Sequence, residues 1–174
     1  GRNVLTRYAD KTAALRAIRA CLRDGSCLSL AEVVPRRGQR LSALVDLTAL
    51  DAALVARLQA AEEAIYDAAD DPQVNWDSAD LAVMLHTAGF ELRAPLNVDV
   101  QEDERHLTAA HLARWFSRSA EGSRPSYAGH LLSHLTEEEL RRVETCFRRQ
   151  LLDQIVTWQI TLVLSARYQR IDDK

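Results

Sequence analysis

The first apolar pattern along the chain predicts a helix that leads into a short buried strand. Between Asp10 and Gly25, apolar side chains recur with the 3.6-residue period of one helix face. Asp10 can cap the start of this helix, and Gly25 can end it in the left-handed conformation. Residues 26–34 are short, apolar and rich in valine, and Pro35 stops the run. A helix followed by such a strand is typical of an α/β sheet.

The middle of the chain predicts two helices and a half-exposed strand. Thr48 begins a long amphipathic pattern, and we interpret residues 36–76 as a helical insertion. A second helix is capped by Asp77 or Ser78 and closed by Gly89. Residues 90–101 then alternate between apolar and polar, and Pro95 within them indicates an edge strand or a bulge.

The last third of the chain predicts two more helices and a central strand. Thr108 can cap a short helix, and residues 118–129 have the composition of a loop. Thr136 and Glu139 form a capping-box pattern at the start of the next helix. The stretch 155–167 is the most β-branched of the chain, and its nearly continuous apolar run predicts a strand covered on both faces.

These elements predict an α/β fold with a small mixed sheet of about three strands, near 26–34, 90–101 and 155–167, and flanking helices. We expect one domain over 1–174 that is a fragment of a longer protein. The first strand would leave an open edge, so we expect self-association or pairing with a missing N-terminal half.

Composition narrows the class of protein. The chain has 174 residues, of which 47% are hydrophobic and 27% charged, an ordinary globular mixture. A net charge of −3 argues against direct binding of nucleic acid, and no apolar run is long enough to cross a membrane. The odd cysteine count without a signal-peptide pattern predicts a cytoplasmic protein with free thiols, mostly buried: Cys21, Cys27 and Cys146.

Three segments together resemble the C-terminal half of a class I S-adenosylmethionine-dependent methyltransferase. They are LRAIRACLRDGSCLSLAEVVP, LAVMLHTAGFELRAPLNVDV and WQITLVLSARY. The resemblance implies that they form the fifth, sixth and seventh strands, with the seventh antiparallel and inserted between the other two. It also implies that residues 36–76 occupy the position of a lid over substrate.

The chain departs from this family at the cofactor site. In the family the cofactor lies on a glycine-rich turn after the first strand. Here the six glycines stand at positions 1, 25, 38, 89, 122 and 129, and they form no G-x-G-x-x-G pattern. We therefore expect no cofactor in this chain, with S-adenosylmethionine or ATP bound elsewhere in the parent protein.

A narrower resemblance points to a different parent. The segments VPRRGQRLSALVDL, AEEAIYDAADDPQVNWD, RPSYAGHL and RRQLLDQIVTWQ are similar to the C-terminal extension of some RarA-type AAA+ replication–recombination ATPases. The chain has no G-x-x-x-x-G-K-[ST] motif, so the resemblance assigns ATP hydrolysis to another part of the protein.

The candidate binding residues follow the first strand. Glu32 lies at its C-terminal end, where ligands collect in open α/β sheets; the alternative is an ion pair with Arg36 or Arg37. Arg36, Arg37 and Arg40 form either a patch for a small anion, phosphate or acidic partner, or a solvated loop. Trp115 and Tyr127 flank a loop that could form a partner surface, with core packing as the alternative.

The other polar residues suggest no site. A basic stripe on the helix after Thr136 is interpreted as solvated: Arg141, Arg142, Arg148 and Arg149. His130 and His134 have the i, i+4 spacing of zinc ligands but lack a third ligand, so we interpret them as surface residues. The acidic run from Glu62 to Asp71 is interpreted as the solvated face of its helix.

Two hypotheses follow. The chain is either a non-catalytic, methyltransferase-like domain of a larger replication–recombination ATPase, serving assembly or partner binding, or the substrate-side half of a methyltransferase. The missing glycine-rich turn favours the first.

Overall fold

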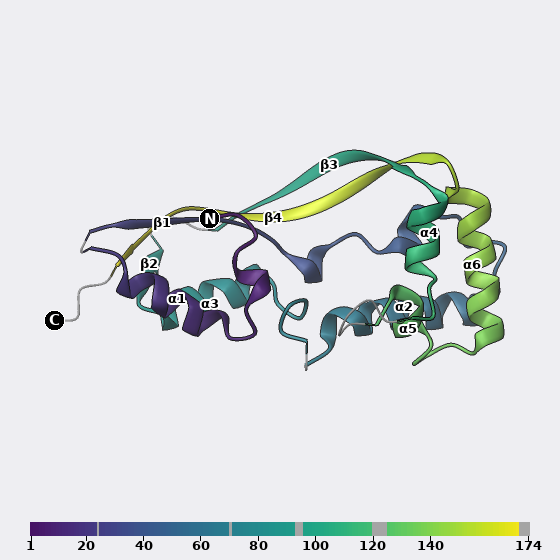
Figure 1. Cartoon of the computed structure of the whole chain (residues 1–174), viewed down its shortest axis with the longest axis horizontal. Helices are drawn as coiled ribbons and strands as arrows, with labels where there is room; N and C mark the ends of the chain where they lie inside the picture. The colour runs from purple at the N-terminus through teal and green to yellow at the C-terminus, as the bar shows by residue number, and fades with distance from the viewer. Residues whose placement is uncertain (24, 70, 93–95, 120–124, 171–174) are drawn as a thin grey trace. The chain divides into compact units, whose positions relative to one another are not determined.

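The computed structural model describes residues 1–23, 25–69, 71–92, 96–119 and 125–170 (Figure 1). The helices and 3-10 turns are η1 (Leu5–Arg7), α1 (Lys11–Ala20), η2 (Pro35–Arg37), η3 (Leu41–Leu44), α2 (Ala52–Asp67), α3 (Ser78–Thr87), α4 (Ala109–Trp115), α5 (Tyr127–Leu131) and α6 (Glu137–Leu151). The strands are β1 (Cys27–Val33), β2 (Phe90–Leu92), β3 (Asn97–Leu107) and β4 (Gln154–Arg170). This alternation of helices and strands confirms the α/β class.

The chain forms two compact units. Unit 1 comprises Gly1–Gly38, Tyr66–Gln101 and Gln159–Lys174, and unit 2 comprises Gln39–Ile65 and Glu102–Trp158. The predicted insertion 36–76 overlaps the first segment of unit 2. The second segment of unit 2, which carries α4, α5 and α6, was not foreseen as part of the same body.

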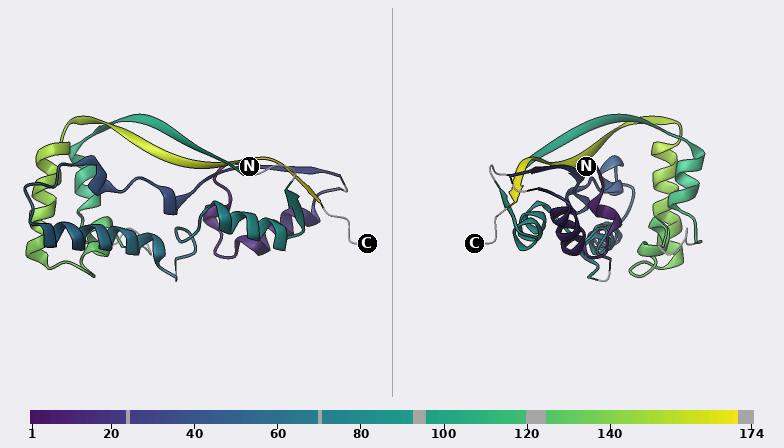
Figure 2. Two further views of the ribbon diagram at one scale, coloured as in Figure 1. Left: turned by 180° about the vertical axis from the view of Figure 1, so that it is seen from behind. Right: turned by 60° about the vertical axis from the view of Figure 1, so that its left-hand side comes forward.

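The sheet has the strand order β1-β4-β2, and β3 also pairs with β4. β4 is antiparallel to both β1 and β2, with Glu32 opposite Val163 and Glu91 opposite Gln169. The last strand of the chain therefore lies antiparallel between two earlier ones, as the resemblance implied. In unit 1, α1 and α3 lie side by side against one face of this sheet (Figures 1 and 2).

The core of unit 1 lies between these helices and the sheet. Trp76 is 1% exposed and precedes the N-cap of α3, where it joins Leu81 in one apolar cluster. The pair has the positions of a hydrophobic staple, which fixes the entry of the chain into the helix. The cluster consists of Leu5, Leu15, Leu30, Val34, Trp76, Leu81, Leu85, Ala88, Phe90 and Val163.

Unit 2 has a separate helical core. The apolar faces of α2, α4, α5 and α6 meet around Phe147, which is fully buried. Its ring packs edge-on against that of Phe116, with 5.5 Å between the ring centres. Leu54 and Leu58 supply the α2 side of this core, at the spacing of one helix turn. Their burial confirms the predicted amphipathic pattern of this helix.

Three predicted helix starts are confirmed by their caps. The Asp10 side chain accepts the Ala13 N–H at 2.8 Å. Asp77 caps α3 and forms a capping box with Asp80, and Thr136 forms one with Glu139 at the start of α6. Such caps depend on residues three apart in sequence, so local chemistry suffices to predict them.

Two predicted helix boundaries are wrong. Helix α2 starts after Asp51 rather than at Thr48, because the Asp51 carboxylate accepts the Leu54 N–H at 2.9 Å. The predicted loop 118–129 contains the start of α5, where Ser126 caps Tyr127–Leu131 through the Gly129 N–H at 3.0 Å. Because α5 ends at Leu131, His130 and His134 do not share one α-helix.

The predicted strand 90–101 comprises two strands, β2 and β3. The path β1-β4-β2 is the expected small sheet of three strands, and β3 adds a fourth by pairing with β4. Pro95 lies outside the described residues. The described pairings between these strands are antiparallel; a parallel bridge joins Arg2 to Ala31. Residues 155–167 were expected to be covered on both faces of the sheet. Residues 161–163 are buried one after another, so both faces are covered there, but Ile155 is 68% exposed.

The cysteine prediction was correct for one thiol of three. Cys146 on α6 is buried, whereas Cys21 and Cys27 are exposed. The latter two stand on either side of the segment that joins α1 to β1. Among the described residues, no helix has both the length and the apolar character needed to cross a membrane.

Candidate functional site at the end of β1

The end of β1 carries a buried carboxylate that holds the start of the chain. Glu32 is fully buried, and its two oxygens accept the backbone N–H groups of Val4 at 2.8 Å and of Leu5 at 3.2 Å. Among the described residues, Glu32 accepts hydrogen bonds from backbone N–H groups and forms no ion pair with Arg36 or Arg37, which was the expected alternative. The carboxylate therefore fixes the position of the first turn, η1.

The first three residues extend this attachment along the edge of β1. The Asn3 N–H donates to the Ala31 carbonyl at 2.9 Å, and the Ala31 N–H donates to the Gly1 carbonyl at 2.9 Å. The Asn3 side chain accepts the Val33 N–H at 3.1 Å while its own backbone has a φ of 50°. Asparagine tolerates this left-handed conformation better than most residues. The edge of β1 that was expected to be open is therefore paired at Ala31.

A pocket of about 460 Å³ in unit 1 contains a buried lysine. Lys11 is 3% exposed, and its ammonium donates to the carbonyls of Tyr8 and Pro72 and lies 5.6 Å from the centre of the Trp76 ring. Burial lowers the pKa of Lys11, while the charges of Asp71 and Glu32 oppose that shift. Sequence reasoning did not single out Lys11; its position at the first turn of an amphipathic helix gave no signal of burial.

The three arginines after β1 do not act as one patch. Arg36 lies 3.4 Å from the Asp67 carboxylate and 3.7 Å from that of Asp80 in unit 1. Arg40 belongs to unit 2, where its Nε and Nη2 both donate to the Glu63 carboxylate at 2.8 Å. Arg37 is exposed, and its carbonyl accepts the Thr161 hydroxyl at 2.9 Å. Carboxylates thus neutralise two of the three guanidinium groups.

Unit 2 contains a buried carboxylate that the sequence analysis assigned to a solvated face. Glu62 is 1% exposed; it accepts the Ser42 N–H at 3.0 Å, the Ser42 hydroxyl, and the Tyr127 hydroxyl at 2.7 Å. Three donors satisfy the buried charge and tie η3 and α5 to α2. A signal existed in the sequence, because Glu62 stands four residues after Leu58 and so continues the apolar stripe.

The two aromatic candidates occupy different settings. The Tyr127 ring packs edge-on against Phe116 at 5.8 Å, so it belongs to the core of unit 2. Trp115 is half-buried, and its ring centre lies 6.2 Å from that of Trp158. The Arg105 guanidinium lies over the Trp158 ring, 4.9 Å from the ring centre. Trp158 belongs to the stretch 155–167, which was expected to be covered on both faces, and it is only half-buried.

The described residues contain no group of three or more His, Cys, Asp or Glu side chains placed to hold a metal ion. Nor do they supply the glycine-rich turn on which a methyltransferase cofactor would lie, because no two of the six glycines in the sequence have that spacing.

Comparisons with known proteins found similarity at the level of structure and none at the level of sequence. No family model matches the chain, and no curated protein matches it. A solved structure described as a "putative methyltransferase" from Bacillus halodurans C-125 aligns with 97% of this chain, at 10% sequence identity and a TM-score of 0.40. This chain covers 66% of the length of that protein.

Proposed function

We propose that this chain is the C-terminal, substrate-side portion of a methyltransferase-like protein whose cofactor site lies in a segment outside these 174 residues. The observation that supports the proposal most is the arrangement at β1. The antiparallel order β1-β4-β2 corresponds to the fifth, seventh and sixth strands of that fold, and residues 1–3 run parallel to β1 at Ala31.

In this proposal, residues 1–3, which run parallel to β1 at Ala31, correspond to the end of the fourth strand of the methyltransferase fold. Glu32 and Val4 follow the bridged residues Ala31 and Arg2, so both lie at the carboxyl edge of the two parallel segments. Ligands of open α/β sheets bind at that edge. The role proposed for Glu32 is to position the Val4–Leu5 backbone there, which makes it a positioning residue.

The test compares the full-length gene product with the 174-residue chain by calorimetric titration with S-adenosylmethionine. We expect micromolar binding by the full-length protein and none by the chain alone. In the full-length protein, Glu32→Ala should weaken binding about tenfold or more, because two backbone donors lose their acceptor. Glu63→Ala, which removes an exposed carboxylate of unit 2, is the matched control and should leave binding unchanged.

Two results would contradict the proposal. Micromolar binding by the chain alone would place the cofactor site within it. A full-length protein that hydrolyses ATP and does not bind S-adenosylmethionine would instead support the RarA-type parent, with this chain serving assembly or partner binding.

A further inference from the structure

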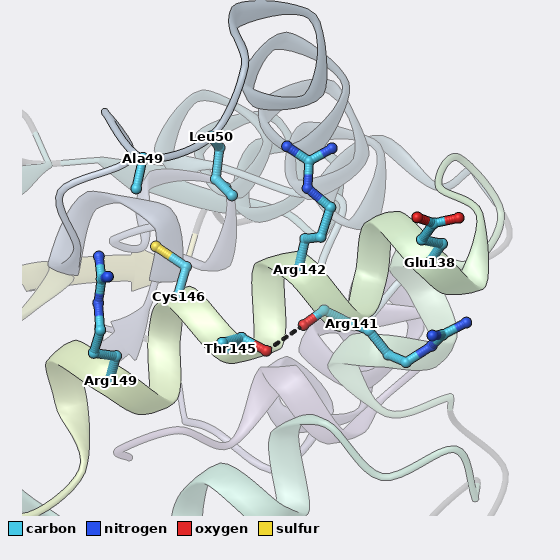
Figure 3. Close-up of a pocket in the computed structure, with 8 residues that line it drawn as sticks. All are labelled: Ala49, Leu50, Glu138, Arg141, Arg142, Thr145, Cys146 and Arg149. Carbon is cyan, nitrogen blue, oxygen red and sulfur yellow. Dashed lines mark hydrogen bonds between the residues drawn. The ribbon is translucent and has the colours of Figure 1, made fainter.

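A groove of about 430 Å³ lies along helix α6 in unit 2. Arg142 and Arg149 extend from α6 towards residues 49–50, with Cys146 between them, whereas Arg141 extends from the other side of the helix (Figure 3). Arg142 and Arg149 are seven residues apart, so about 10 Å of helix axis separates them and they share one face.

The opposite wall of the groove is fixed to α6. The Gln150 amide accepts the Asp46 N–H at 2.8 Å and donates to the Asp46 carbonyl at 2.8 Å. The Asp51 carboxylate accepts the Leu54 N–H at 2.9 Å through one oxygen and an N–H of the Arg142 guanidinium at 3.0 Å through the other. These contacts lie on either side of residues 49–50, so the groove is preformed.

The four arginines of α6 divide into two kinds. Arg148 is neutralised by Glu144 at 2.8 Å, one helix turn away, and Arg142 shares the Asp51 carboxylate. Within the described part of the chain, Arg141 and Arg149 make no ion pair and no side-chain hydrogen bond. A guanidinium group has five N–H donors. The donors of Arg149, together with those of Arg142 that Asp51 does not accept, are therefore available on one side of the groove to bind a ligand.

The available carboxylates do not satisfy these donors. The Asp46 carboxylate accepts the Thr48 N–H, which lowers the pKa of Asp46 more than the charge of Arg149 does, and Asp51 is already shared. Glu138 also lines the groove, one helix turn before Arg142, but among the described residues it forms no ion pair with that guanidinium, and it lies about three helix turns from Arg149. The groove therefore offers charged donors without matching acceptors, and its apolar wall at Ala49 and Leu50 can contact an organic group.

We propose that this groove binds a small organic ligand through a diphosphate group. Arginine recognises phosphate oxygens with two N–H donors at once, and two guanidinium groups on one helix face can engage the two phosphates from opposite ends. The volume of the groove leaves room for the rest of the ligand beside Leu50. The inference concerns unit 2 and does not depend on the proposed methyltransferase relationship.

The first experiment titrates the chain with inorganic pyrophosphate, with citrate as a carboxylate of similar charge. We expect saturable one-to-one binding of pyrophosphate, weakened about tenfold or more by Arg149→Gln because one charge-assisted contact is lost. Arg148→Gln changes the net charge equally but removes an arginine that Glu144 already pairs, so its affinity should stay within about twofold. Equal losses in both variants, or tighter binding of citrate, would overturn the proposal.

A second experiment locates the ligand. In a Cys21→Ser, Cys27→Ser background, Cys146 is the one remaining thiol of the three in the sequence. Cys146 is only 5% exposed, and it lines the groove between the two arginines, so a maleimide has to enter the groove to reach it. Bound pyrophosphate should therefore slow its alkylation, and Arg149→Gln should abolish that protection. An alkylation rate unaffected by saturating pyrophosphate would show that the ligand binds elsewhere and would refute the site.

Discussion

The anchoring role of Glu32 leads to a quantitative prediction for Glu32→Ala. The carboxylate accepts two backbone N–H groups, and hydrogen bonds to a charged group contribute about 1.5–3 kcal/mol each. Leu5 is fully buried, so its N–H would lose its partner without access to water. We therefore expect a loss of at least about 3 kcal/mol in the local stability of residues 1–7.

Amide hydrogen exchange measures this effect at the two donors. A loss of about 3 kcal/mol corresponds to exchange roughly 100-fold faster at Val4 and Leu5. Glu32→Gln keeps one carbonyl oxygen as an acceptor, so it should give an intermediate rate. Glu63→Ala serves as the control, because its partner Arg40 lies in unit 2 and exposed ion pairs contribute about 1 kcal/mol or less. Unchanged exchange at both amides in Glu32→Ala would refute the anchoring role.

Three further variants test the buried and capping groups. Tyr127→Phe removes one of three donors to Glu62 and should lower the free energy of unfolding, measured with urea, by about 1.5–3 kcal/mol. Tyr8 is 48% exposed, so the control Tyr8→Phe should leave that free energy almost unchanged. Equal effects of the two variants would contradict the buried network. Burial lowers the pKa of Lys11 below 10.5, so between the lowered value and 10.5 the unfolded chain binds a proton that the folded chain does not. The free energy of unfolding should therefore rise with pH in this range. Thermal unfolding of Lys11→Met should lack this rise, and an unchanged rise would contradict the role of Lys11. The Thr136 N–H and Arg57 hold the pKa of Glu139 below 4.5, so its contribution is complete above pH 4.5 and is lost as pH falls through the lowered value. Glu139→Gln should flatten that acid loss of melting temperature, and an unchanged acid profile would disprove the link.

The predictions that succeeded depend on short-range chemistry. The caps at Asp10, Asp77 and Thr136 involve donors within three residues of the capping side chain, so the sequence pattern contains the whole interaction. The β-branched run at the end of the chain likewise predicts its own strand. Its place between β1 and β2 came from the resemblance to methyltransferases, and the pairing of β4 with both strands agrees with it.

The errors occur where burial depends on a distant partner. Glu62 lies beside an apolar stripe, and only the approach of Ser42 and Tyr127 makes its burial favourable. Glu32 was expected to meet a ligand or an arginine, and instead it meets backbone from residues 27 or more positions earlier. No local pattern specifies which chain segment will supply such donors.

The sequence by itself thus determined the α/β class, most helices, their caps and two of the strands, because propensity and periodicity act over a few residues. The tertiary structure decided that the chain forms two cores, that Lys11, Glu32 and Glu62 are buried, and that the arginines of α6 divide between paired and available groups. The physical reason is that a polar side chain can be buried only where distant segments supply its hydrogen-bond partners, and folding alone brings those segments together.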